Sequence, residues 1–188
     1  MMLLLLGLAL FLGAHSVRIV ADSWRAGFIA RRGPGPWKAL YALLSAAGFV
    51  LIVVGYGQAR GGAPLLITGA GARYAAYLLV WLGFVCVTAA YWPRNHIKRV
   101  LGEPMVFGVG LWALGHLLVE TKPAALALFG AFLVWAAVDY TSLRARARAA
   151  PVAAGVLNTF LAVVAGSIAW AVFAGLLHKG LIGVSPMA

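Results

Sequence analysis

The sequence predicts an all-α fold, a polytopic transmembrane bundle of about six spanning helices. The chain has 188 residues, of which 64% are hydrophobic and only four are acidic, and its mean hydropathy is +0.97. A helix of about 20 apolar residues crosses the hydrocarbon core of a bilayer. Several such runs follow one another here, separated by short polar connections. We therefore expect one transmembrane domain over residues 1–188.

Proline and glycine mark the connections between the apolar runs. Gly-Pro-Gly-Pro at 33–36 precedes the second run, and Pro104, Pro123 and Pro151 stand where first helical turns are expected to begin. The first run has no basic residue ahead of it, so we expect a retained helix and not a cleaved signal peptide. The fourth run is short and is expected to tilt or to extend into its flanks. The expected helices are 3–22, 39–57, 74–92, 104–119, 124–142 and 153–177.

The lysines and arginines alternate between the two sides of this layout. Connections rich in Lys and Arg stay in the cytoplasm, so both termini are predicted to face away from it. Topology explains the net charge of +11 better than a nucleic-acid partner does, and none is expected. The expected cytoplasmic side carries Arg18, Arg25, Arg31, Arg32, Lys38, Arg94, Lys98, Arg99, Arg144, Arg146 and Arg148, and the opposite side carries Arg60, Arg73, Lys122 and Lys179.

His15 lies within the first apolar run, where an imidazole is costly and usually has a function. His15, Arg18 and Asp22 follow i, i+3, i+7 spacing, so they are expected to share a helix face that points into the bundle. Alternatively, Arg18 and Asp22 form a surface ion pair near the cytoplasmic end. For His15 two interpretations stay open, a structural hydrogen bond or ligation of a metal.

A second histidine, His116, lies in the fourth run on one stripe with Gly108 and Trp112. The glycine removes side-chain bulk and the indole offers a flat wall, so the stripe suits a planar macrocycle. Glycines on membrane helices also allow close helix packing, which is the alternative. The expected boundaries place His15 deeper than His116, so a tilted helix or a tilted ring would be needed for both to bind one porphyrin.

Other familiar kinds of site are missing from the sequence. The single cysteine, Cys86, excludes an internal disulfide and a Cys-x-x-Cys metal site. No phosphate-binding glycine loop, His-Glu-x-x-His or Gly-x-Ser-x-Gly motif is present. Hydrolysis and phosphoryl transfer therefore have no basis in the sequence.

Three segments resemble the NnrU family of bacterial membrane proteins: LGLALFLGAHSVRIV, MVFGVGLWALGHLLVE and LALFGAFLVWA. That family is associated with nitrate, nitrite and nitric oxide metabolism in denitrifying bacteria and is related to the zeta-carotene isomerase of plants and cyanobacteria. The resemblance covers about residues 3–150. The chain departs from the pattern at VLGEPMVFG, where many relatives have an Arg-His-Pro-like stretch, so a role tied to that Arg-His pair is not carried over.

The resemblance implies a heme b in the bacterial inner membrane, with its iron held by His15 and His116. Trp112 and Gly108 would then lie against the macrocycle. Arg18, or Arg94 and Arg99, would pair with the heme propionates. Isomerase activity does not follow from matching histidines.

Two classes of function are compatible with these features. The first is a heme-binding membrane protein of nitric oxide or nitrite metabolism, acting in redox sensing or as an isomerase-like enzyme. The second is a cofactor-free membrane subunit that assembles with a larger respiratory or transport complex. The expected partners are membrane lipid, heme, and either another membrane protein or a second copy of the chain.

Overall fold

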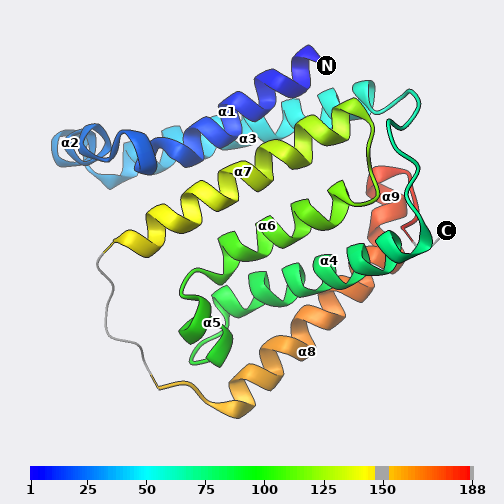
Figure 1. Cartoon of the computed structure of the whole chain (residues 1–188). Helices are drawn as coiled ribbons and strands as arrows, with labels where there is room; N and C mark the ends of the chain where they lie inside the picture. The colour runs from blue at the N-terminus through cyan, green and yellow to red at the C-terminus, as the bar shows by residue number, and fades with distance from the viewer. Residues whose placement is uncertain (147–152, 187–188) are drawn as a thin grey trace. The chain divides into compact units, whose positions relative to one another are not determined.

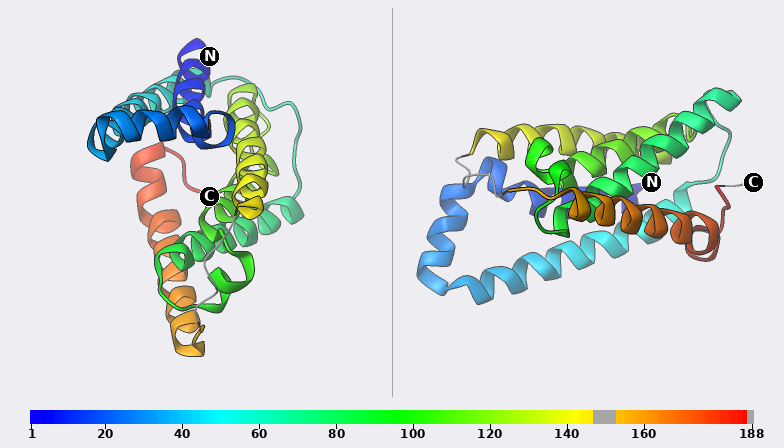
Figure 2. Two further views of the ribbon diagram at one scale, coloured as in Figure 1. Left: turned by 90° about the vertical axis from the view of Figure 1, so that its left-hand side faces the viewer. Right: turned by 90° about the horizontal axis from the view of Figure 1, so that it is seen from below.

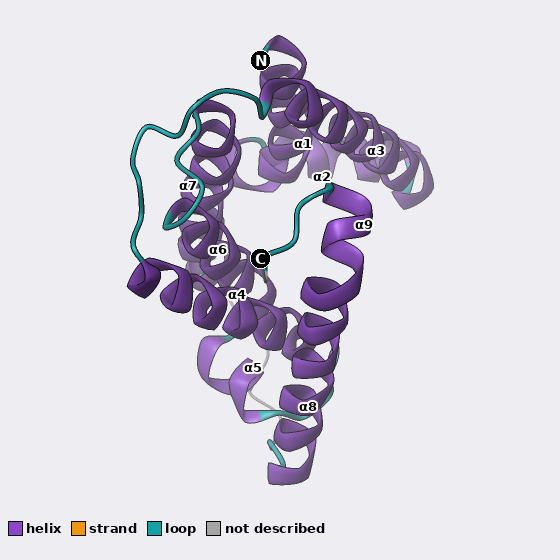
Figure 3. Cartoon of the chain, turned by 90° about the vertical axis from the view of Figure 1, so that its right-hand side faces the viewer, coloured by secondary structure: helices purple, strands orange, loops and turns teal. Residues whose placement is uncertain are grey.

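A computed structural model of the chain describes residues 1–146 and 153–186. All regular elements within these ranges are helices (Figures 1 and 3). Arg148 and Pro151 lie outside the described residues. The elements are α1 (Met2–Val20), α2 (Asp22–Arg32), α3 (Pro34–Ala59), α4 (Ala70–Tyr91), α5 (His96–Leu101), α6 (Pro104–Leu117), α7 (Pro123–Ala145), α8 (Val156–Val172), the π-helical turn η1 (Phe173–Leu177) and α9 (His178–Ile182).

These helices confirm the all-α membrane fold. Within the part of the chain that the structure describes, five helical segments are long and apolar enough to cross a bilayer: α1, α3, α4, α7 and the continuous run Val156–Ile182. The fourth predicted span, α6, has 14 residues. At about 1.5 Å per residue it is only about 21 Å long, shorter than a hydrocarbon core of about 30 Å. The expected short fourth helix is therefore confirmed, although it ends two residues earlier than predicted.

The helices divide into two compact units, each described below by itself. Unit 1 contains Met1–Ile67 and Glu120–Trp135, and unit 2 contains Thr68–Val119 and Ala136–Ala188. The first part of α7 thus belongs to unit 1 and its last part to unit 2. The prediction of a single domain stays a prediction.

In unit 1, α1 and α3 pack with their backbones in direct contact, and Figure 1 shows the two helices running side by side. A Cβ atom on Gly7 would lie 2.6 Å from the Ile52 nitrogen, and a Cβ atom on Gly48 would lie 2.7 Å from the Phe11 nitrogen. No side chain fits at such distances. Membrane helices associate through small residues of this kind, because lipid supplies no hydrophobic driving force between them.

The first helix ends earlier than the sequence predicts, and a separate helix follows it. α1 ends at Val20, and α2 begins at Asp22. Figure 2 shows α2 running at a steep angle to α3. Gly33, with φ of 81°, then allows the turn into α3. The segment was expected to be a connection.

This break corrects the expectation that Arg18 and Asp22 point into the bundle with His15. Their side chains are 55% and 52% exposed, and the closest Arg18–Asp22 approach is 3.9 Å. Asp22 lies nearer to Arg25, at 3.0 Å. The surface ion pair, the alternative interpretation, is the correct one, because the helix axis changes direction at Ala21.

In unit 2, α4 lies between α6 and α8, and glycines form both contacts. A Cβ atom on Gly108 of α6 would lie 2.7 Å from the carbonyl oxygen of Gly83 on α4. A Cβ atom on Gly166 of α8 would lie 2.7 Å from Val85 Cα, also on α4. Unit 2 therefore uses the same close backbone packing as unit 1.

A buried asparagine organises the turn between α4 and α5. Asn95 is 2% exposed. Its side-chain oxygen accepts a hydrogen bond from Lys98 N at 2.7 Å, and its amide donates to the carbonyls of Ala89 and Trp92. The start of α8 joins this turn, since Gly155 N donates to the Arg94 carbonyl at 2.8 Å. These bonds satisfy the backbone groups that the end of α4 leaves without helical partners.

The packing in unit 1 predicts opposite outcomes for two glycines of α1. Gly7→Ala forces α1 away from Ile52 and should cost about 1–3 kcal/mol of unfolding free energy. A Cβ atom on Gly13 would meet nothing within 4 Å, so Gly13→Ala should be neutral or stabilising by up to about 1 kcal/mol. Thermal unfolding in detergent, followed by circular dichroism, measures both, and equal midpoints for the two variants would contradict the α1–α3 contact.

Candidate functional site

The imidazole of His15 lies among aromatic rings of unit 1. Its ring stacks on Phe11 with centroids 4.3 Å apart and 28° between the planes. Tyr41 of α3 lies 5.1 Å away, and Trp135 of α7 meets the ring edge-on at 5.9 Å. Three helices of unit 1 therefore fix the position of this histidine.

One nitrogen of His15 is held by the backbone of its own helix. Nδ1 donates a hydrogen bond to the Phe11 carbonyl at 2.7 Å, since a carbonyl oxygen can only accept. The neutral ring then carries its proton on Nδ1, and the lone pair lies on Nε2. Metal-ligating histidines have this arrangement, in which a hydrogen bond on one nitrogen orients the other toward the metal.

His116 of unit 2 repeats the arrangement. Its Nδ1 donates to the Trp112 carbonyl one turn earlier, at 2.8 Å, and the Trp112 ring lies 5.1 Å from the imidazole. The two predicted histidines therefore share one local geometry, each on its own unit. Trp112 contacts His116, as the stripe on α6 predicted.

The third member of that stripe, Gly108, contacts α4. The Gly108 carbonyl oxygen lies against Gly83, and a Cβ atom on Gly108 would clash with the Gly83 carbonyl oxygen. This placement favours the helix-packing alternative over a surface left open for a macrocycle. Gly115 packs in the same way, since its Cβ would lie 2.8 Å from Val80 Cγ2.

Two polar groups on the helices around His15 are buried without hydrogen bonds. They are the indole nitrogen of Trp135 and the hydroxyl of Ser45, one turn beyond Tyr41 on α3. A buried donor left without an acceptor typically costs about 1–3 kcal/mol. An acceptor supplied by a bound ligand would remove that cost for Trp135.

The other two histidines are placed differently. His96, at the start of α5, bonds through Nδ1 and through its backbone nitrogen to Thr159 Oγ1, each at 2.9 Å. His178 donates from Nδ1 to the Val184 carbonyl at 2.6 Å, is half-buried, and meets the Phe173 ring edge-on at 5.9 Å. Neither has the ring surroundings of His15, and both serve below as controls.

The donor set fits a heme iron better than a metal held by protein ligands alone. Among the described residues, no group of three or more His, Cys, Asp or Glu side chains lies together. A bare transition metal commonly needs three or four protein ligands. Heme iron needs only one or two axial ligands, because the porphyrin supplies the other four. Each of the two histidines, taken by itself, would supply one such ligand through its Nε2 atom.

Sequence reasoning named both histidines as candidate ligands but did not predict most of the side chains that surround them. The rings around His15 come from Phe11, Tyr41 and Trp135 on three helices of unit 1, and for Tyr41 and Trp135 no local spacing indicates a contact with His15. Phe11 is the exception, because it precedes His15 by one helical turn and the i, i+4 spacing puts the two on one face.

These observations define a class of protein: a multi-pass helical membrane protein with single histidines oriented within its helices. The sequence profile described as "NnrU protein" matches residues 3–186. The chain therefore belongs to the NnrU family, as its resemblance predicted. Comparison with curated proteins and with solved structures gives no match.

The hydrogen bonds of the two histidines predict their tautomers. In protein prepared without a cofactor, at a pH where the rings are neutral, His15 and His116 should both carry the proton on Nδ1. Nitrogen NMR of histidine-labelled protein distinguishes the two tautomers, and His15→Gln and His116→Gln assign the signals. Protonation of either ring on Nε2 would contradict the carbonyl contacts.

Proposed function

We propose that this member of the NnrU family binds heme b in the membrane, with His15 and His116 as candidate axial ligands. One observation carries the proposal: each histidine donates from Nδ1 to the carbonyl one turn earlier, which leaves Nε2 as the nitrogen for iron. The proposal does not require that both histidines hold the same iron.

The surroundings of His15 support the proposal. The rings of Phe11, Tyr41 and Trp135 pack around the part-buried imidazole and restrict its rotation. Nδ1 bonded to a carbonyl makes the ring a stronger electron donor at Nε2. The indole N–H of Trp135 offers a donor to an acceptor bound beside the imidazole.

We still propose that Arg18 pairs with a heme propionate, but at the membrane surface and not inside the bundle. It follows His15 by one turn, and its side chain is more than half exposed beside Asp22. A guanidinium at the helix end can reach an anionic group at the membrane surface. The Arg18 contact would therefore be at the interface and not inside the bundle.

Bound heme b supplies a one-electron redox centre and, where an axial position is open, a site for a small ligand such as nitric oxide. The family's association with denitrification supports a role in nitric oxide or nitrite metabolism, either as a redox sensor or in an isomerase-like reaction. We place the protein in the bacterial inner membrane with both termini away from the cytoplasm, on the basis of the distribution of Lys and Arg.

Visible spectroscopy tests the ligands. The full chain, expressed with ample heme and purified in detergent, should show a Soret band and a reduced-minus-oxidised difference spectrum. His15→Ala and His116→Ala should each shift the Soret band or lower the heme content at least severalfold, because an axial bond is lost. His96→Ala and His178→Ala remove imidazoles with other contacts and should leave the spectrum unchanged.

Two outcomes would overturn the proposal. A colourless wild-type preparation would favour the cofactor-free membrane subunit. Equal spectra for wild type, His15→Ala and His116→Ala would show that other residues hold the iron.

The orphaned indole of Trp135 gives a second test. Trp135→Phe removes the N–H and keeps an aromatic ring. We expect it to reduce the stabilisation gained on heme binding, by an amount on the order of 1 kcal/mol for one lost hydrogen bond. Thermal unfolding of the heme-free and heme-loaded forms measures that difference. Trp81→Phe is the matched control, because the Trp81 indole already donates to Ser167 Oγ at 2.9 Å. An equal change in the heme-dependent stabilisation of both variants would show that Trp135 does not contact the heme.

A further inference from the structure

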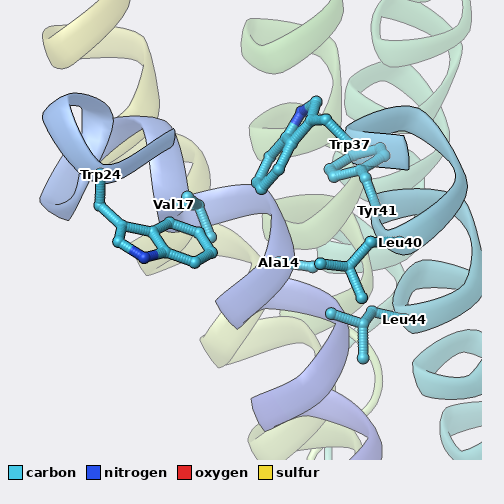
Figure 4. Close-up of a pocket in the computed structure, with 7 residues that line it drawn as sticks. All are labelled: Ala14, Val17, Trp24, Trp37, Leu40, Tyr41 and Leu44. Carbon is cyan, nitrogen blue, oxygen red and sulfur yellow. The ribbon is translucent and has the colours of Figure 1, made fainter. Parts of the chain in front are cut away.

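An apolar hollow lies in unit 1 where α2 joins α1 to α3 (Figure 4). Its volume is about 50 Å³, too small to enclose a porphyrin. The lining side chains carry no charge: Ala14 and Val17 of α1, Trp24 of α2, and Trp37, Leu40, Tyr41 and Leu44 of α3. Such a hollow suits a few methylene groups of a hydrocarbon chain.

Three aromatic rings stand at this end of unit 1. Trp24 lies 5.9 Å from Phe28 and 6.0 Å from Trp37, and Phe28 lies 6.0 Å from Trp37. Figure 4 shows the two indoles beside the hollow, one from α2 and the other from α3. Tryptophans concentrate where a membrane helix meets the lipid headgroups. The cluster therefore places the hollow just inside the headgroup layer.

Positive charge surrounds the same end. Residues 18–38 contain five basic side chains and a single acidic one, Asp22. Asp22 lies 3.0 Å from Arg25. Arg31 and Arg32 are exposed at the end of α2, and the Arg32 guanidinium lies 5.4 Å from the centre of the Phe28 ring. The cationic groups thus adjoin the aromatic cluster.

We propose that this surface binds an anionic phospholipid, with an acyl chain in the hollow and the phosphate at Arg31 and Arg32. A zwitterionic lipid would fill the hollow equally well but would lack the net negative charge that the basic residues complement. The basic and aromatic side chains of α2 share one side of the helix, since Arg32 follows Phe28 by one turn, and this brings the charges beside the rings. Neither histidine lines the hollow, although Tyr41 both lines it and contacts the His15 ring.

Native mass spectrometry tests the proposal on the full chain in detergent. Protein is mixed with equal amounts of dioleoyl phosphatidylglycerol and dioleoyl phosphatidylcholine, and the two bound lipids are counted. We expect the wild type to retain phosphatidylglycerol selectively. Arg31→Gln/Arg32→Gln should reduce that selectivity roughly 20- to 30-fold, since each basic side chain near an anionic headgroup contributes a factor of about five.

A matched control separates a specific site from general attraction to basic connections. Lys98→Gln/Arg99→Gln removes the same charge from the last turn of α5, a helix whose residues do not line the hollow. We expect it to preserve most of the selectivity. An equal loss in both double variants would overturn the proposal.

The hollow is tested by a pair of changes on α1. Val17→Phe fills it and should lower retention of both lipids, whereas Val20→Phe adds the same ring at a position that is 81% exposed and should not. Equal retention in the two variants would overturn the acyl-chain site.

Tryptophan quenching gives a measurement that does not depend on the folding of Val17→Phe. Brominated phosphatidylglycerol should quench wild-type fluorescence more than brominated phosphatidylcholine does. Trp24→Phe/Trp37→Phe should abolish that difference, and its persistence would contradict the proposed position of the lipid.

Discussion

Close backbone contact at glycines is the interaction on which both units depend. Gly7 and Gly48 bring α1 against α3, and Gly83, Gly108 and Gly166 bring α4 against its two neighbours. In lipid the association of helices relies on such contacts, because apolar side chains gain little by leaving one hydrocarbon medium for another. The glycines therefore decide which helix faces are inside, and only then can other side chains be positioned.

The setting of His15 follows from that packing. Because α1 and α3 lie so close, Tyr41 of α3 reaches the imidazole held by the Phe11 carbonyl. The α7 residues of unit 1 add Trp135. An imidazole with one nitrogen bonded to backbone and its ring between aromatic side chains is oriented before any ligand arrives. The binding of a ligand at this histidine, as we propose, would then require little reorganisation of the protein.

The segments at the ends of the long helices carry charged side chains that the middles of those helices largely lack. The α2 segment combines exposed arginines with tryptophan and phenylalanine, and the α4–α5 turn combines Lys98 and Arg99 with the buried amide of Asn95. Positive charge at such ends is expected from topology alone. The ring cluster and the hollow beside α2 are features that topology does not explain. Because of them we propose a defined binding position for anionic lipid and not only a general attraction to it.

The sequence by itself determined the all-α membrane fold, the approximate helix positions and the family, because these depend on apolar runs and motifs that follow one another along the chain. It also named His15 and His116 as candidate ligands, which stays a prediction. For Gly108 the sequence left open a ligand surface or helix packing, and for Arg18 and Asp22 an inward face or a surface ion pair. The structure places Gly108 against Gly83 and the ion pair at the surface. Only the tertiary structure decided these points, together with the α2 helix and the aromatic rings around His15. The reason is physical: which face of a helix is buried, and where its axis turns, depends on neighbours that are distant in the sequence.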